Sequence, residues 1–137
     1  MSRTRSNAII RANTLTDLSQ YVGCAVVLSS SSNGPRAELW SEDEIPFGVI
    51  LYADEESVSV APFDGGYAGT MLCKVLEESS AGARLYCVNS GANVGFGTSN
   101  YENFPGATFY AAVAVEGGVA GEMVEAIPKS PAPVTLA

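Results

Sequence analysis

Two acidic triplets are the residues whose types and spacing could support acid–base chemistry: Glu42-Asp43-Glu44 and Asp54-Glu55-Glu56. A glycosidase uses two carboxylates that face each other across a cleft, one of them with a raised pKa. Adjacent acids between short strands point into water instead, which favours solvated turns. Neither triplet has the Asp-x-Asp-x-Asp-Gly spacing of a calcium loop, so we expect no metal site.

Other candidates for catalysis lack a chemical partner. The chain contains no histidine, which excludes Ser-His and Cys-His catalysis and histidine as a metal ligand. Cys24, Cys73 and Cys87 form no CxxC and each lies in an apolar run, which predicts buried free thiols and assembly in a reducing cytoplasm. The glycine-rich segment 91–97 lacks the strand and helix that flank a phosphate-binding loop. We therefore expect a non-enzymatic protein without a cofactor.

Composition and charge narrow the class of protein further. The 137 residues are enough for one domain with its own core. Hydrophobic residues are 47% and charged residues 16%, a combination that excludes disorder throughout and a coiled coil. The net charge of -8 opposes binding to phosphate backbones, so we expect no nucleic-acid partner for the acidic body. No run of about 20 apolar residues occurs, so we expect no membrane span.

Short β segments separated by turn residues dominate the chain from residue 24 onward. The predicted strands cover residues 24–28, 36–40, 47–53, 57–61, 70–76, 83–88, 107–115 and 123–127. This spacing predicts an all-β fold, a small barrel or a sandwich. Before these strands, Thr14 or Thr16 can cap a short helix or 3₁₀ turn that Gly23 ends.

The ends of the chain are predicted to be extended. Residues 1–13 read as an arm that carries three arginines and no acid, whereas residues 38–64 carry eight acids and no base. Residues 14–127 form the predicted β domain, and residues 128–137, with three prolines, a predicted extended tail. The arm either binds an acidic surface or nucleic acid, or is a frayed terminus. Its candidate contact residues are Arg3, Arg5, Ile9, Ile10 and Arg11.

A long loop rich in glycine, asparagine and serine is predicted over residues 89–106. Loops of this length inside a small domain are typically functional or mobile. Its aromatic residues Phe96, Tyr101 and Phe104 either contact a partner or cover one end of the β domain.

A series of short, glycine-centred motifs runs through the chain in a characteristic order. The motifs are Asp17-Leu18-Ser19, Val22-Gly23, Pro46-Phe47-Gly48-Val49-Ile50, Val58-Ser59-Val60-Ala61-Pro62-Phe63, Ala81-Gly82-Ala83 and Gly121-Glu122 followed by Val124-Glu125-Ala126. In this arrangement the chain resembles the small head-decoration, or capsid cement, proteins of tailed bacteriophages, over about residues 14–127.

The resemblance implies a homotrimer on the outer surface of the virion. Such proteins are made in the host cytoplasm, bind the major capsid protein of an expanded icosahedral head and stabilise it against internal pressure. By position, residues 1–13 would be the capsid-binding arm. Two other classes stay open: a carbohydrate- or receptor-binding β module (an adhesin) that uses residues 89–106, and a small hydrolase that uses the carboxylates.

Overall fold

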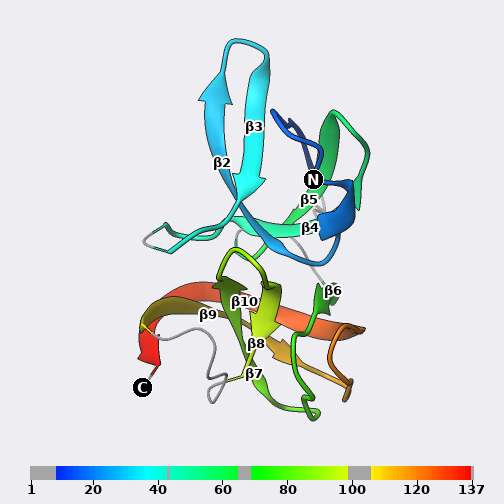
Figure 1. Cartoon of the computed structure of the whole chain (residues 1–137), viewed down its shortest axis with the longest axis vertical. Coiled ribbons are helices and arrows are strands. Elements are labelled where there is room, and N and C mark those ends of the chain that lie inside the picture. The colour runs from blue at the N-terminus through cyan, green and yellow to red at the C-terminus, as the bar shows by residue number, and fades with distance from the viewer. Residues whose placement is uncertain (1–8, 43, 65–68, 99–105, 137) are drawn as a thin grey trace, which may run out of the picture.

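The computed structural model describes residues 9–42, 44–64, 69–98 and 106–136, and within these ranges the protein is all-β. The elements, in chain order, are β1 Ile10–Asn13, the 3₁₀ turn η1 Ser19–Tyr21, β2 Ala25–Ser31, β3 Gly34–Leu39, β4 Gly48–Ala53, β5 Ser57–Pro62, β6 Met71–Lys74, β7 Arg84–Asn89, β8 Val94–Gly97, β9 Gly106–Ala114 and β10 Met123–Leu136. They form a closed barrel and a second five-stranded sheet, stacked along the long axis of the molecule (Figure 1).

The barrel is closed by its first strand. Its strand order is β1-β3-β2-β4-β5, and β1 pairs antiparallel with β5 from Ile10↔Val60 to Asn13↔Ser57. The parallel pair Asn13↔Arg36 joins β1 to β3 and completes the ring. Alternate residues along β5 point inward, so Val58 and Val60 are fully buried together with Ala12 of β1. The β2–β3 hairpin extends past the barrel (Figure 1).

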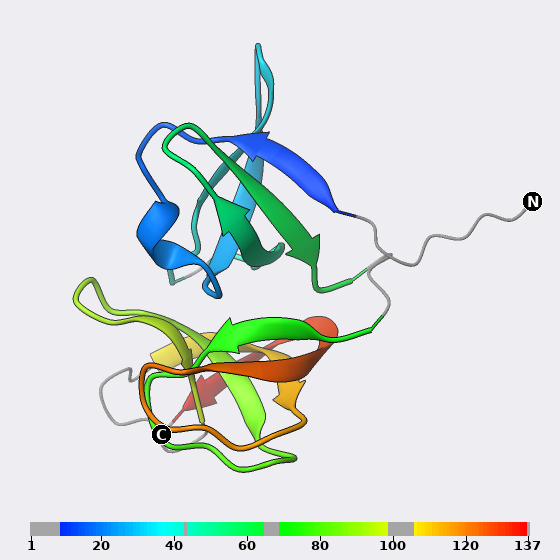
Figure 2. The same ribbon diagram turned by 90° about the vertical axis from the view of Figure 1, so that its right-hand side faces the viewer.

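The second sheet has the strand order β6-β10-β9-β7-β8 and curls toward closure. Its two edges meet where Val75, just after β6, forms a parallel bridge with Phe96 of β8. The amide of Leu76 donates to the carbonyl of Phe96 (2.9 Å) at the same place. Figure 2 shows the sheet from the side on which β6 and β10 lie next to each other.

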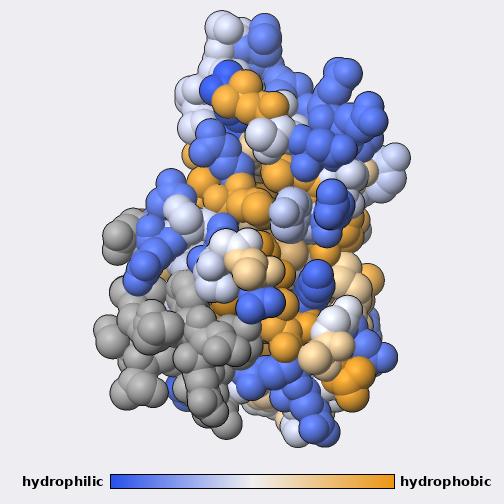
Figure 3. All heavy atoms as spheres, in the orientation of Figure 1, coloured by the Kyte–Doolittle hydropathy of each residue, from blue (hydrophilic) through white to orange (hydrophobic). Residues whose placement is uncertain are grey.

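One hydrophobic core joins the barrel to the second sheet. Trp40 and Phe63 from the barrel belong to the same buried cluster as Cys73, Phe96 and Val124 from the second sheet. Phe63 packs edge-on against Phe96 with their ring centroids 6.2 Å apart. Apolar residues also reach the surface in the middle of the face shown in Figure 3, where the barrel meets the second sheet. The barrel and the second sheet are therefore stabilised by the same hydrophobic core.

Three segments that the sequence predicts as irregular are strands. Residues 10–13 of the predicted arm are β1, residues 94–97 of the predicted loop are β8, and residues 128–136 of the predicted tail continue β10. The predicted short helix is only the 3₁₀ turn at residues 19–21. Each strand exists because a neighbouring strand satisfies its backbone groups, which local residue preferences do not report.

The prolines of the predicted tail fit into a strand because β10 lies at an edge along this stretch. Pro128 pairs with Ala112 and Pro133 with Phe109, and the register shifts between residues 128 and 132. Proline is tolerated on edge strands and at bulges, where its missing N–H removes no ladder hydrogen bond. Residues 128–136 therefore belong to a strand of the second sheet, and the prediction of a separate tail is wrong for them.

Candidate functional site

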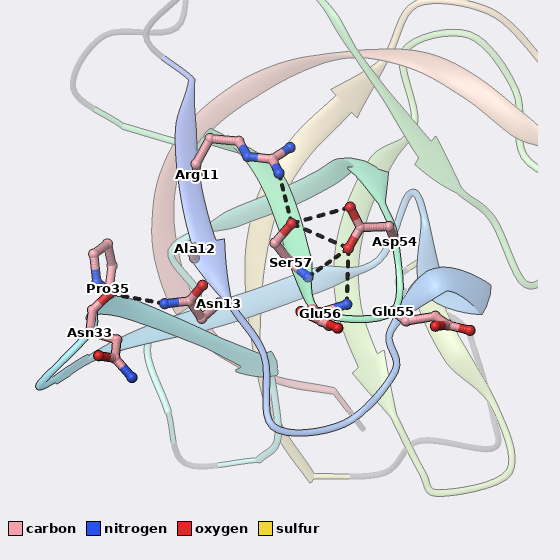
Figure 4. Close-up of a pocket in the computed structure, with 9 residues that line it drawn as sticks. All are labelled: Arg11, Ala12, Asn13, Asn33, Pro35, Asp54, Glu55, Glu56 and Ser57. Atoms are coloured by element: carbon pink, nitrogen blue, oxygen red, sulfur yellow. Dashed lines mark hydrogen bonds between the residues drawn. The ribbon is translucent and has the colours of Figure 1, made fainter.

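An open groove of about 680 Å³ lies where β1 enters the barrel. It is bounded by β1, by the β4–β5 turn and by the tip of the β2–β3 hairpin (Figure 4). The residues that line it are Arg11, Ala12, Asn13, Asn33, Pro35, Asp54, Glu55, Glu56 and Ser57. The groove thus lies beside residues 11–13 of β1, and three acids and one arginine line it.

Asp54 shapes the β4–β5 turn through its carboxylate. Its Oδ1 accepts hydrogen bonds from the amides of Glu56 and Ser57, both at 2.9 Å, and from the Ser57 hydroxyl at 3.3 Å. The hydrogen bond donated by the Glu56 amide lowers the pKa of Asp54 most, followed by the hydrogen bond from the Ser57 amide. The positive charge of Arg11 lowers this pKa further. The carboxylate is therefore ionised at neutral pH and fully occupied in holding the turn.

Arg11 attaches β1 to the outer face of β5. Its guanidinium donates to the hydroxyls of Ser57 (2.7 Å) and Ser59 (3.0 Å). The Ser57 hydroxyl thus lies between Arg11 and Asp54, accepting from the first and donating to the second (Figure 4). This chain of contacts adds side-chain bonds to the β1–β5 backbone ladder.

The β2–β3 hairpin holds β1 from the other side. Asn13 Nδ2 donates to the Asn33 carbonyl at the hairpin tip (2.9 Å). The amide of Thr14 donates to the Glu56 carbonyl (2.9 Å), so the residue that follows β1 is fixed as well. Four separate contacts therefore secure a strand of only four residues.

The charged side chains Asp54 and Arg11 of the groove make their contacts within the protein itself. Asp54 bonds to the amides of its own turn, Arg11 bonds to β5, and Glu55 and Glu56 are exposed. No group of three or more Cys, Asp or Glu residues close enough to hold a metal ion occurs within the described ranges. The arrangement therefore holds β1 in place against β5 and the β2–β3 hairpin.

The structure separates the predicted arm residues. Ile9 is 46% exposed and precedes β1, while Ile10 is half-buried and Arg11 lies in the groove. Ile10 and Arg11 are thus part of the barrel instead of a free arm. Arg3 and Arg5 lie outside the described residues.

The predicted loop residues are also divided. Phe96 is fully buried in the shared core, so it packs against Phe63 and is not a surface contact. The neighbouring position 95 requires a glycine, because a Cβ there would lie 2.8 Å from the Lys74 carbonyl oxygen. Tyr101 and Phe104 lie outside the described residues.

The first acidic triplet is a surface turn next to Trp40. Glu44 Oε1 accepts from the hydroxyl of Ser41 (2.9 Å), and the Trp40 indole N–H donates to the Glu44 carbonyl. Glu42 and Glu44 are exposed, and Asp43 lies outside the described residues. Glu44 therefore stabilises this surface turn through its contacts with Ser41 and Trp40.

All three cysteines are free and buried, as predicted from their apolar surroundings. Burial raises the pKa of the Cys24 thiol to about 11, and it also raises the pKa values of Cys73 and Cys87. Thiols with raised pKa values in an apolar core are poor nucleophiles and act as small hydrophobic side chains.

Sequence reasoning missed the hydroxyls that hold β1. Ser57 and Ser59 flank Val58 in an alternating strand, so the pattern already placed both hydroxyls on the outer face of β5. It gave no sign that Arg11, 46 residues away from Ser57, would lie on that face. The alternation of the sequence therefore predicts that both hydroxyls lie on the outer face of β5, but it does not predict that Arg11 contacts them.

Comparison with protein-family models and with curated protein sequences finds no significant match to this chain. Among the described residues, no helix is long and apolar enough to span a membrane.

Proposed function

We propose that this protein is a non-enzymatic decoration, or cement, protein of a viral capsid. It binds the outside of an expanded icosahedral head as a homotrimer and stabilises the shell against internal pressure. Its partners are the major capsid protein and further copies of itself. Residues 1–9 form the attachment arm, with Arg3, Arg5 and Ile9 as contact residues, while Ile10 and Arg11 anchor that arm to the barrel.

The anchoring of β1 is the observation that carries this proposal. A protein that holds a shell together must transmit force from its attachment segment into its folded body. A pull on residues 1–9 acts along β1 and loads the β1–β5 ladder, the Arg11 bonds and the Asn13 bond together. Because these contacts share the load, the strand resists being drawn out of the barrel.

The shared core supports the proposal in a second way. Trp40, Phe63 and Phe96 pack in one cluster between the barrel and the second sheet. Asn89 Nδ2 also donates to the Trp40 carbonyl (2.8 Å) across the junction. Force that enters the barrel can therefore pass to the second sheet through this packed core.

Removal of residues 2–8 tests the attachment arm while it leaves β1 intact. We expect the truncated protein to keep its thermal unfolding temperature and to lose binding to expanded heads from the source, measured by cosedimentation. A matched variant, Arg3→Gln with Arg5→Gln, tests charge alone, and Ser2→Gln with Thr4→Gln is its control. Undiminished head binding by the folded truncation would refute the arm assignment.

Copy number separates decoration from the adhesin alternative. A decoration protein approaches one copy per major capsid subunit in purified particles, measured by quantitative mass spectrometry, whereas an adhesin is present in few copies. The adhesin alternative has already lost one of its three aromatic contact residues, because Phe96 lies in the core. A ratio of a few per cent would nevertheless favour it over decoration.

A further inference from the structure

An asparagine followed by a glycine lies at the tip of the β2–β3 hairpin. The pair is Asn33-Gly34, and this dipeptide occurs once in the chain. It is typical of tight hairpin turns, and Gly34 has a φ of +101°, which glycine adopts without steric cost. Asparagine is a thermolabile residue. It deamidates most readily before glycine, because the missing Cβ leaves the following backbone nitrogen free to attack the side-chain amide.

The side-chain amide of Asn33 is open to solvent at this tip. Asn33 is exposed, and no hydrogen bond within the described ranges involves its side chain. Its backbone makes the contacts instead, since its N–H donates to Ser31 Oγ (3.3 Å) and its carbonyl accepts from Asn13 Nδ2 (2.9 Å). Figure 4 shows the amide group directed away from β1 and from the acidic turn. A Cβ on Gly34 would meet nothing within 4 Å, so a ring has room to form there.

The other asparagines in the described ranges are less reactive by the same criteria. Asn13 and Asn93 are each followed by a β-branched residue, whose side chain hinders attack by its backbone nitrogen. Asn89 is half-buried, and both ends of its amide are hydrogen-bonded within the protein. Among these residues, Asn33 alone combines an exposed, unbonded amide with a following glycine.

We infer that Asn33 is a site of spontaneous deamidation in the folded protein. The backbone nitrogen of Gly34 loses its proton and attacks Cγ of Asn33, which closes a succinimide ring and releases the side-chain nitrogen as ammonia. Water then opens the ring at either carbonyl. One opening gives aspartate with the original backbone, and the other gives isoaspartate, whose backbone runs through Cβ and Cγ of residue 33. The reaction consumes only water, and the inference does not rest on the proposed function.

Isoaspartate at residue 33 changes the anchoring of β1. The Asn33 carbonyl that accepts from Asn13 is part of the backbone, and isoaspartate converts it into a free carboxylate outside the main chain. The main chain also becomes longer at the turn, beside the last ladder pair Ser31↔Gly34. Both products add a negative charge at a groove that three acids already line. The hairpin tip therefore holds β1 less firmly after the reaction.

Mass spectrometry of the purified full-length protein, incubated in warm and mildly alkaline buffer, tests the inference. Trypsin releases residues 12–36 as one peptide that holds Asn13 and Asn33 together. Electron-based fragmentation then locates the new carboxyl group and distinguishes isoaspartate from aspartate, and a sample taken before incubation corrects for conversion during digestion. We expect Asn33 to convert at least tenfold faster than Asn13 or Asn89, with isoaspartate among the products.

Asn33→Gln is the matched control, because its longer side chain would have to close a larger ring while the backbone carbonyl stays in place. We expect no comparable conversion at residue 33 in this variant. A synthetic peptide of residues 28–37 gives the rate without the fold. Equal conversion of Asn33 and Asn13, or conversion of Asn33 more than a hundredfold slower in the protein than in the peptide, would overturn the inference.

Amide hydrogen exchange tests the consequence for β1, because local opening of a strand raises its exchange rate. We expect residues 10–13 to exchange at least threefold faster in the incubated wild type than in the fresh protein, and incubated Asn33→Gln to exchange like the fresh protein. Asn33→Asp adds the charge without the longer backbone, so it should also exchange like the fresh protein. Unchanged exchange in a sample that is mostly isoaspartate would refute the loosening of β1, and equal acceleration in Asn33→Asp would refute the role of the backbone.

Discussion

Ala12 tests whether residues 10–13 belong to the barrel or to a free arm. Its side chain is 4% exposed and packs in the barrel interior. In Ala12→Asp a carboxyl group enters that interior, where desolvation raises its pKa. If the group stays protonated at pH 7, folding must neutralise a carboxyl whose ordinary pKa is about 3.9, which costs about 4 kcal/mol at ~1.4 kcal/mol per pH unit.

The loss of stability in Ala12→Asp should depend on pH with a definite sign. A pKa that is higher in the folded state means that the folded protein binds more protons than the unfolded chain. Stability therefore falls as pH rises, by about 1.4 kcal/mol per unit above pH ~4, and the charge-dependent loss disappears below that pH. A loss of about 4 kcal/mol is large against the ~5–15 kcal/mol stability of a typical domain.

Urea denaturation followed by tryptophan fluorescence measures this loss, because Trp40 is the single tryptophan and is 1% exposed. Ala12→Asn is the neutral control of the same shape, so its difference from Ala12→Asp isolates the charge. Ile9→Asp is the exposed control next to β1. If Ala12→Asp at pH 7 stays within about 0.5 kcal/mol of the wild type, residues 10–13 are not a barrel strand.

Two further predictions concern the shared core. Phe96→Ala should reduce the free energy of unfolding by about 3–5 kcal/mol, because it removes a fully buried ring from between the two sheets. A loss below ~1 kcal/mol in urea denaturation would show that this side chain is not buried in the core. The thiols of Cys24, Cys73 and Cys87 should not react with a disulfide reagent in the native protein and should all react in urea. Their reaction should follow the tryptophan transition, and a thiol that reacts well before it would show that the sheets separate first.

The sequence predicted the strands that alternate or run apolar without interruption. The segment 57–61 became β5, and the apolar run from Phe109 became part of β9. Alternation indicates a strand with one buried face, and a continuous apolar run indicates a strand with two buried faces, so both can be recognised from the residue types alone. The pattern could not specify a barrel joined to a second sheet, because that arrangement depends on which strands become neighbours.

β8 and the end of β10 were missed for a common reason. Glycines in β8 and prolines in β10 are turn and linker residues by local preference. Gly95 is needed where the Lys74 carbonyl approaches closely, and the prolines lie along an edge. In both places the neighbouring backbone determines that the segment is a strand, whereas the local sequence alone predicts a turn or a linker.

The candidate site could be predicted only in part. The arginines near the N-terminus and the Asp54 turn were visible as a basic segment and an acidic turn. Their contact through Ser57 was not, because it joins β1 to β5 across 46 residues.

The prolines of β10 bear on how this protein meets its neighbours. Among the described residues, β6 pairs with β10 only from Met123 to Ala126, so the outer edge of residues 128–136 has no strand beside it. Exposed edges invite pairing with other chains, and proline and lysine on an edge discourage it. Three prolines and Lys129 lie along this edge. This edge of β10 is therefore protected against the addition of a strand from another chain.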